Sequence, residues 1–160
     1  MAIDLTKLPE ETLNDFKKYK ILILGPYKNY AIKFLEKCRD KLRNFGFNDT
    51  YLVSDNCLYE KSKYDRNEKN YRNSLYQIDN SDLLIFILLP HKDLSGVSIE
   101  LQHAIEKKYY NKVIIFMPEE DNGISSMIKG STSYAKLYVH FFKLRSEILD
   151  SIVNVSIAAL

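Results

Sequence analysis

Three short runs of apolar residues divide the chain into segments. They occupy residues 21–24, 83–89 and 113–117. None of these runs alternates between apolar and polar positions, a pattern typical of strands that are covered on both faces, as in a parallel sheet. Two shorter stretches, residues 51–53 and 137–139, are candidates for further strands. The pattern predicts a mainly parallel sheet of five strands.

Helical periodicity fills the intervals between the runs. In residues 30–45 the apolar positions recur every three or four residues, and Gly46 follows as a stop signal. Residues 96–108 carry a second apolar stripe of this kind. Helices at residues 9–19 and 144–154 are expected to cover the two ends of the chain. Because strands alternate with helices, the sequence predicts an α/β fold, a three-layer, doubly wound, Rossmann- or flavodoxin-like sheet.

The length and the charge fit one domain over residues 1–160, since a domain typically takes roughly 150 residues. The formal net charge of +2 is too small to predict binding to nucleic acid or to a membrane surface. The longest apolar run is far shorter than the roughly 18 residues of a membrane span, and the N-terminal residues lack the apolar centre of a signal peptide. Cys38 and Cys57 do not make a disulfide framework. We therefore expect a cytoplasmic protein.

Residues 54–72 form the least regular part of the chain. They form either an active-site loop or a long solvated connection, and the composition favours the solvated connection. Between Tyr59 and Tyr76, tyrosines alternate with lysines and arginines. Such interleaving can bind single-stranded nucleic acid, but it also describes a solvated helix in a Tyr- and Lys-rich protein, which is the interpretation adopted here. We do not expect nucleic acid as a partner.

Candidate chemistry lies in the segments that follow the strands, because ligands of open parallel sheets bind beyond the carboxyl ends of the strands. The first such segment is Gly25-Pro26-Tyr27. It has a single glycine, so neither a GxGxxG motif nor a P-loop is present, and we expect no dinucleotide or triphosphate cofactor of those kinds. His91 and His103 have no Cys or second His at ligand spacing, so we expect no metal site.

Glu100 follows the third strand and stands near the start of a predicted helix, where its carboxylate can point back across the strand ends. A lone acidic residue in a first helical turn is ordinarily explained by the helix dipole. Here it belongs to an ordered pattern, which consists of Gly25-Pro26-Tyr27, Ser81-Asp82, Asp93, Gly96, Glu100-Leu101 and Ala104. Over about Lys20 to Pro118, this pattern resembles the nucleoside 2-deoxyribosyltransferase family.

The resemblance implies an enzyme that cleaves the N-glycosidic bond of a deoxynucleoside or nucleotide and releases or transfers the base. By position, Glu100 would be the nucleophile that attacks the anomeric carbon, and Tyr27 would orient it. A carboxylate suits this role because departure of the base generates oxocarbenium character. Asp82 and Asp93 match positions associated with base and sugar recognition and with the proton of the leaving base. The remaining substrate-binding residues that the resemblance implies are Gly25, Pro26, Gly96 and Ser98.

Two departures from the family pattern flank the glutamate. Ser98 and Gln102 stand where the family usually has glycine, and both are expected to crowd the nucleophile. The substrate and the choice between hydrolase and transferase stay open. A second resemblance, to Toll/interleukin-receptor-like domains that cleave NAD, rests on Ser95, Ser98, Glu100 and Leu101. A third interpretation is a noncatalytic nucleotide-binding or protein-interaction module of the same fold.

Apolar residues gather at the C-terminus between Ile152 and Leu160. Left exposed, they would make the protein prone to aggregation, whereas packing against a second subunit removes them from water at about 25 cal/mol per Å². Members of the family that the chain resembles form symmetric oligomers, so we expect at least a homodimer. The alternative is that this segment folds back on its own sheet.

Overall fold

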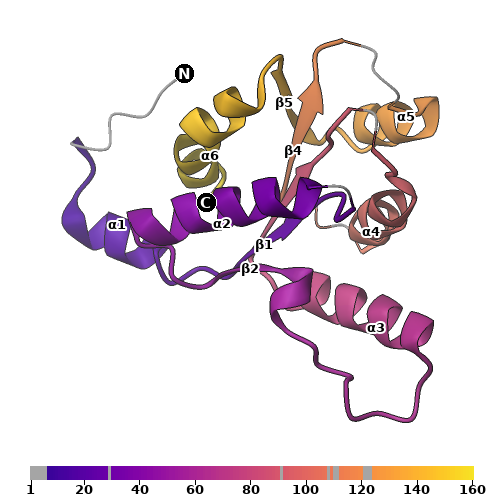
Figure 1. Cartoon of the computed structure of the whole chain (residues 1–160). Coiled ribbons are helices and arrows are strands. Elements are labelled where there is room, and N and C mark those ends of the chain that lie inside the picture. The colour runs from indigo at the N-terminus through magenta and orange to yellow at the C-terminus, as the bar shows by residue number, and fades with distance from the viewer. Residues whose placement is uncertain (1–6, 29, 91, 108, 110–111, 121–123) are drawn as a thin grey trace.

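A five-stranded parallel sheet forms the centre of the molecule (Figure 1). The computed structural model describes residues 7–28, 30–90, 92–107, 109, 112–120 and 124–160. Its strands are β1 (Ile21–Leu24), β2 (Thr50–Leu52), β3 (Leu83–Ile87), β4 (Val113–Pro118) and β5 (Tyr138–Phe142), in the spatial order β2-β1-β3-β4-β5. Each of the three predicted apolar runs overlaps one of these strands, and the predicted doubly wound α/β fold is confirmed.

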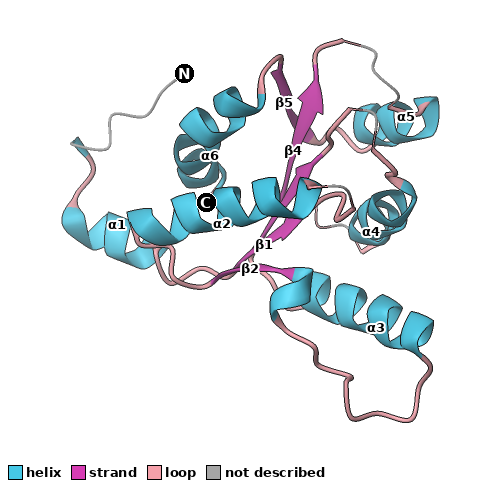
Figure 2. Cartoon of the chain, in the orientation of Figure 1, coloured by secondary structure: helices cyan, strands magenta, loops and turns pink. Residues whose placement is uncertain are grey.

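Helices cover both faces of the sheet (Figure 2). They are α1 (Glu10–Phe16), α2 (Ala31–Phe45), α3 (Arg66–Asp79), α4 (Ser95–Glu106), α5 (Ser126–Tyr134) and α6 (Arg145–Ala159), with the short 3-10 turn η2 (Val53–Asp55) after β2. Helices α1, α2 and α6 lie on one side of the sheet, and α3, α4 and α5 lie on the other. In the described part of the chain, no helix combines the length and apolarity needed to cross a membrane.

Helix α3 begins inside the stretch that was expected to be an irregular connection. Asp65 caps its start by accepting a hydrogen bond from the backbone N–H of Glu68 at 2.9 Å. Its buried face includes the amides Asn73 and Gln77, so the helix lacks the apolar stripe by which helices are recognised in a sequence. Tyr71 on its outer face is exposed, as expected of a solvated helix.

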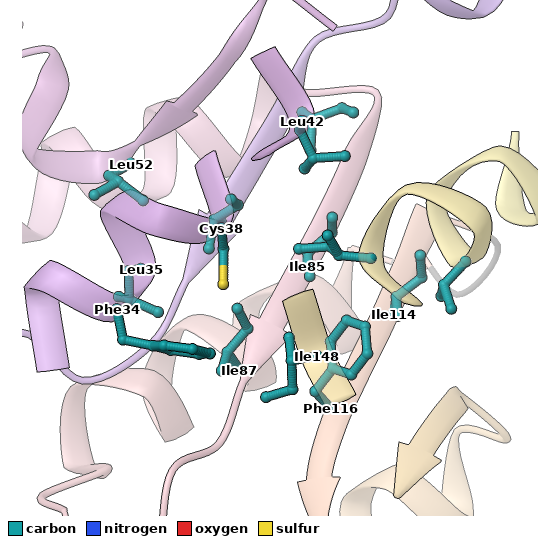
Figure 3. Packing of buried hydrophobic residues seen from close by; sticks show 14 of the residues in the cluster. Phe34, Leu35, Cys38, Leu42, Leu52, Ile85, Ile87, Ile114, Phe116 and Ile148 are labelled. Atoms are coloured by element: carbon teal, nitrogen blue, oxygen red, sulfur yellow. The ribbon is translucent and has the colours of Figure 1, made fainter. Parts of the chain in front are cut away.

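The larger core cluster packs α2 and α6 against one face of the sheet (Figure 3). Leu35, Cys38 and Leu42 of α2 are fully buried there, together with Ile85 of β3. Burial raises the pKa of the Cys38 thiol to about 12, so this cysteine stays protonated and serves as a small apolar side chain. This layer is an apolar support for the strands.

The apolar C-terminal residues belong to the same core. Ile152, Val155 and Ile157 of α6 are buried in this cluster, and Ser156 satisfies its hydroxyl by donating to the carbonyl of Ile152 at 2.6 Å. The expectation that these side chains need a second subunit to cover them is therefore wrong, because the helix continues to Ala159 and folds back on its own sheet. The homodimer itself stays a prediction.

Candidate active site

Open parallel sheets bind ligands in a crevice beyond the carboxyl ends of the strands, where the strand order reverses, and here that point lies between β1 and β3. From β1 the chain moves outward to β2, whereas β3 lies on the other side of β1, so the order of the strands reverses at this point. Leu24 pairs in register with Phe86, so both strands deliver their following segments to the same edge of the sheet. The segment after β1 contains Gly25 and Tyr27, and the segment after β3 leads into α4.

Gly25 permits a close approach of the chain at this edge. A Cβ atom on Gly25 would lie 2.9 Å from the carbonyl oxygen of Ile87 and 3.0 Å from Cδ2 of Leu35. Any larger residue would push the end of β1 away from β3 or from α2. Pro26 is buried beside it. Both residues shape the crevice, and their expected contacts with a substrate stay predictions.

Glu100 is the charged group at the crevice. It is only 7% exposed, and within the described part of the chain it is the one buried residue among the Asp, Glu, Lys, Arg and His side chains. It lies on the inner face of α4 with Val97, Leu101 and Ala104. A carboxylate that only complemented the helix dipole would stay in solvent. Its burial therefore calls for another explanation.

Burial changes the acidity of Glu100. Loss of hydration raises the pKa of its carboxyl from 4.5 to about 7, and a hydrogen bond donated by the Ser74 hydroxyl to Oε2 opposes part of this rise. Near neutral pH, both the protonated and the ionised form of Glu100 are therefore populated. A carboxyl in a cleft with a strongly shifted pKa is typical of a functional site.

Tyr27 is the second polar side chain of the crevice. Its hydroxyl is buried and lies near the backbone of Val53, without a hydrogen bond of good geometry to any residue that the structure describes. Burial, followed by the negative charge of Glu100, raises the pKa of the phenol well above its usual value. Tyr27 therefore stays a neutral donor in electrostatic contact with the carboxylate. The structure brings together two of the three predicted catalytic residues, Glu100 and Tyr27.

Helix α3 supplies polar groups that the sequence analysis missed. Besides Ser74, it carries Gln77, whose Nε2 donates to the carbonyls of Val53 at 2.9 Å and Asn56 at 3.0 Å. The neighbouring Asn73 also donates to Val53, at 3.3 Å. These bonds tie the segment after β2 to α3, beside the crevice. Their signal in the sequence was a run of polar residues, which ordinarily indicates exposure to solvent.

Asp82, the third predicted catalytic residue, lies at the opposite edge of the sheet. It precedes β3, is exposed, and accepts a hydrogen bond from the backbone N–H of Lys20 at 2.7 Å. The five residues of β3 span about 16 Å at roughly 3.3 Å per residue, and Glu100 follows the far end of that strand. The structure therefore separates Asp82 from Glu100, which corrects the expectation that both serve one site.

Asp93 lies in the segment between β3 and α4. Its carboxylate accepts hydrogen bonds from the backbone N–H of Ser95 at 3.0 Å and from the Ser95 hydroxyl at 2.7 Å. These two bonds, with a smaller contribution from Lys28, hold the pKa of this exposed carboxyl below its usual value. Asp93 thus fixes the start of α4, and its ionised form suits hydrogen bonding to a substrate rather than donation of a proton.

Ser98 and Gln102 do not crowd Glu100, contrary to expectation. At about 100° per residue, both lie roughly 160° around α4 from Glu100. They line a cavity of about 390 Å³ between α4 and α5, and Ser98 donates to the carbonyl of Leu94 at 2.8 Å. Gly96 is exposed, and a Cβ there would meet nothing within 4 Å. The substrate contacts expected of Ser98 and Gly96 stay predictions.

His103 is held between two helices and does not lie free in solvent. Its Nε2 lies 2.8 Å from Oδ1 of Asp79, and its side chain is 15% exposed. His91 lies outside the described residues. Within the described ranges, no three His, Cys, Asp or Glu side chains are grouped as they would be around a metal ion.

Solved structures share this arrangement of sheet and helices, although no protein-family model and no curated protein matches the sequence. The CMP N-glycosidase BcmB of Clostridium botulinum is 15% identical, with a TM-score of 0.57 over 83% of this chain and 97% of that one. The chain has a nucleoside 2-deoxyribosyltransferase-like fold. A 2-deoxyribosyltransferase from Bacillus psychrosaccharolyticus is 21% identical, with a TM-score of 0.57 over 82% and 90% of the two chains.

A third protein of this nucleoside 2-deoxyribosyltransferase-like fold is BlsM, known from a solution structure. It is 13% identical to this chain, with a TM-score of 0.58, and the match covers 88% of this chain and 91% of BlsM. At such low identities the likeness establishes the fold. The chemistry has to be argued from the crevice itself.

Proposed function

We propose that this protein cleaves the N-glycosidic bond of a nucleoside or nucleotide, with Glu100 as the nucleophile. The observation that carries the proposal is the burial of Glu100 at the point where the strand order reverses. Support comes from the fold, which is shared with a CMP N-glycosidase and a 2-deoxyribosyltransferase. A buried carboxylate is costly to a fold, and such groups are found disproportionately at functional sites.

The reaction has two steps. In the first, a carboxylate oxygen of Glu100 forms a bond to the anomeric carbon while the bond between that carbon and the base nitrogen breaks. The electron pair of the broken bond leaves with the base, which takes up a proton from the solvent. In the second, water or another base attacks the same carbon, the bond between that carbon and Glu100 breaks to restore the carboxylate, and the attacking group loses a proton to the solvent. The carboxylate stabilises the positive charge that develops on the sugar in both steps.

Tyr27 suits the role of orienting the nucleophile. Its hydroxyl is buried near the backbone of Val53, and the negative charge of Glu100 raises its pKa. A neutral phenol can donate a hydrogen bond to an ionised carboxylate that comes within reach. Glu100 is only 7% exposed, and Ser74 of α3 donates to its Oε2, so the carboxylate is held away from bulk solvent.

A substrate panel tests the proposal. The protein is incubated with deoxynucleosides, deoxynucleoside monophosphates, CMP and NAD, and released base or nicotinamide is measured by chromatography. We expect free base from the nucleosides or nucleotides and intact NAD. Release of nicotinamide alone would favour the NAD glycohydrolase instead. No product from any of the four would contradict both enzymes and favour a noncatalytic module.

A homodimer remains part of the proposal through the family resemblance. Met127 and Tyr134, which line the cavity between α4 and α5, are 81% and 86% exposed. Large apolar and aromatic side chains at a surface are typical of contact regions between proteins. Light scattering at micromolar concentration is expected to give about twice the chain mass of 18.7 kDa. A mass near 18.7 kDa would contradict the dimer.

A further inference from the structure

Helix α3 contributes a hydroxyl group that reaches the proposed nucleophile. The Oγ atom of Ser74 donates a hydrogen bond to Oε2 of Glu100, and the two residues come from different helices, 26 positions apart in the sequence. Oε1 of Glu100 has no hydrogen bond within the described part of the chain. The two oxygens of the carboxylate are therefore not equivalent, since Oε2 accepts a hydrogen bond from Ser74 and Oε1 accepts none from the described residues.

Ser74 is held in place by contacts that do not involve Glu100. One residue before it, Asn73 bonds the carbonyl of Val53, and one turn after it, Gln77 bonds the same carbonyl. Further along α3, Asp79 pairs with His103 of α4. A donor whose backbone is fixed on both sides restricts the rotation of the carboxylate that it binds, because the hydrogen bond weakens steeply as its angle departs from linearity.

We propose that Ser74 is the positioning residue of the nucleophile: it anchors Oε2 of Glu100 and leaves Oε1 as the oxygen that attacks the anomeric carbon. The proposal rests on the proposed function. In the first step, Oε1 forms the new bond to the sugar, while the hydrogen bond from Ser74 stabilises the ionised carboxylate before attack. A hydrogen bond from a neutral donor also disperses charge without competing as a proton donor.

The surroundings of Glu100 add few other charges. Tyr27, from the segment after β1, is the titratable group in electrostatic contact with Glu100 within the described residues. The neighbouring face of the sheet is apolar, and α3 presents the uncharged Ser74. One turn beyond Glu100 on α4, His103 pairs with Asp79 of α3, and neither residue is among the groups that shift the pKa of Glu100. Removal of the Ser74 hydroxyl is therefore expected to change the acidity of Glu100 in one direction, upward.

A structural role for Ser74 is the competing explanation, because its hydroxyl also joins α3 to α4. Asp79→Asn provides the matched control. It weakens the other polar contact between these helices, with His103, and leaves Ser74 and Glu100 in place. Ser74→Thr is the conservative variant, since it keeps a hydroxyl group at the same position.

The kinetic experiment compares Ser74→Ala, Ser74→Thr and Asp79→Asn with the wild type across pH 5 to 9. We expect Ser74→Ala to lower kcat by about 10- to 100-fold at pH 7 with little change in KM, and to move the acid limb of the profile to higher pH. Ser74→Thr should recover most of the rate, and Asp79→Asn should leave both kcat and the limb unchanged. Wild-type behaviour of Ser74→Ala, or equal losses in Ser74→Ala and Asp79→Asn, would overturn the proposal.

A second measurement separates this proposal from the proposed function, because it needs no turnover. The carboxyl carbon of Glu100 is titrated by ¹³C NMR, with Glu100→Gln used to assign the signal. Ser74→Ala should raise the midpoint, and Asp79→Asn should not. An unchanged midpoint in Ser74→Ala would overturn the role of Ser74 whatever the substrate panel shows. A raised midpoint in a protein that cleaves no substrate would overturn the proposed function and leave the contact standing.

Discussion

The two edges of the sheet provide opposite environments for an acidic side chain. At the carboxyl edge, Glu100 is buried and its pKa is raised to about 7. At the amino edge, Asp82 is exposed and accepts a hydrogen bond from the backbone of Lys20. Both residues flank β3, and both matched the pattern of a catalytic pair. The comparison shows that the place in the sheet, rather than the residue type, decides whether a carboxyl group is buried and acquires a raised pKa.

The physical reason lies in the topology. All five strands run in the same direction, so the segments after β1 and β3 converge at one edge, where α3 and α4 also cover the crevice. A carboxylate placed there loses hydration and becomes sensitive to each neighbouring dipole. At the other edge, Asp82 stays exposed to solvent, and the hydrogen bond that it accepts from the backbone of Lys20 helps to align β1 with β3.

Neutralising each carboxylate in turn tests the difference between the two edges most directly. Glu100→Gln should lower turnover by about 10³-fold or more, because the amide cannot supply the negative charge or form the bond to the sugar. Asp82→Asn, the matched control, should retain activity within about threefold. Base release from the panel substrates measures both. Equal losses in the two variants would contradict the separation of the two edges.

The same carboxylate should leave a signature in the stability of the fold. Because the pKa of Glu100 is raised from 4.5 to about 7, the folded chain holds this proton more tightly than the unfolded chain. The resulting stabilisation is complete below pH 4.5 and is lost as the pH rises through about 7. Glutamine does not titrate, so from pH 4 to pH 8 Glu100→Gln should gain on the order of 3 kcal/mol in unfolding free energy relative to the wild type.

Urea unfolding of both proteins at pH 4 and pH 8 checks this prediction. The difference between the two proteins should grow in favour of Glu100→Gln at the higher pH. A difference that is the same at both pH values would show that the carboxyl of Glu100 keeps its ordinary acidity in the folded chain. The raised pKa would then be contradicted.

The smallest effects on stability are expected for substitutions of two glycines at the carboxyl edge. Gly25→Ala should destabilise the fold by about 1–3 kcal/mol, because the new Cβ would lie 2.9 Å from the carbonyl oxygen of Ile87. Gly96→Ala should stabilise it by up to about 1 kcal/mol, since a Cβ at Gly96 meets nothing within 4 Å and alanine favours helix. Thermal unfolding measures both. If Gly96 also contacts the substrate as predicted, Gly96→Ala raises KM despite its stability.

The sequence could predict the elements whose buried side chains are apolar. The runs that became β1, β3 and β4 pack on both faces, and α2 shows its apolar stripe because every residue of its inner face is hydrophobic. Helix α3 was expected only as a solvated helix, and its buried face was missed because that face includes the polar residues Asn73 and Gln77. Helix α5 was not predicted, because only Ile128 and Thr132 of its nine residues are buried.

By itself, the sequence determined the α/β fold and directed attention to Glu100 and Tyr27, because buried strands and the order of motifs along the chain are local features. The tertiary structure alone decided the partners of these residues. It placed Asp82 at the far edge, turned Ser98 away from Glu100 and brought Ser74 to the carboxylate. These contacts join elements that are distant in the chain, and their geometry follows from strand order and helix rotation, which no single segment contains.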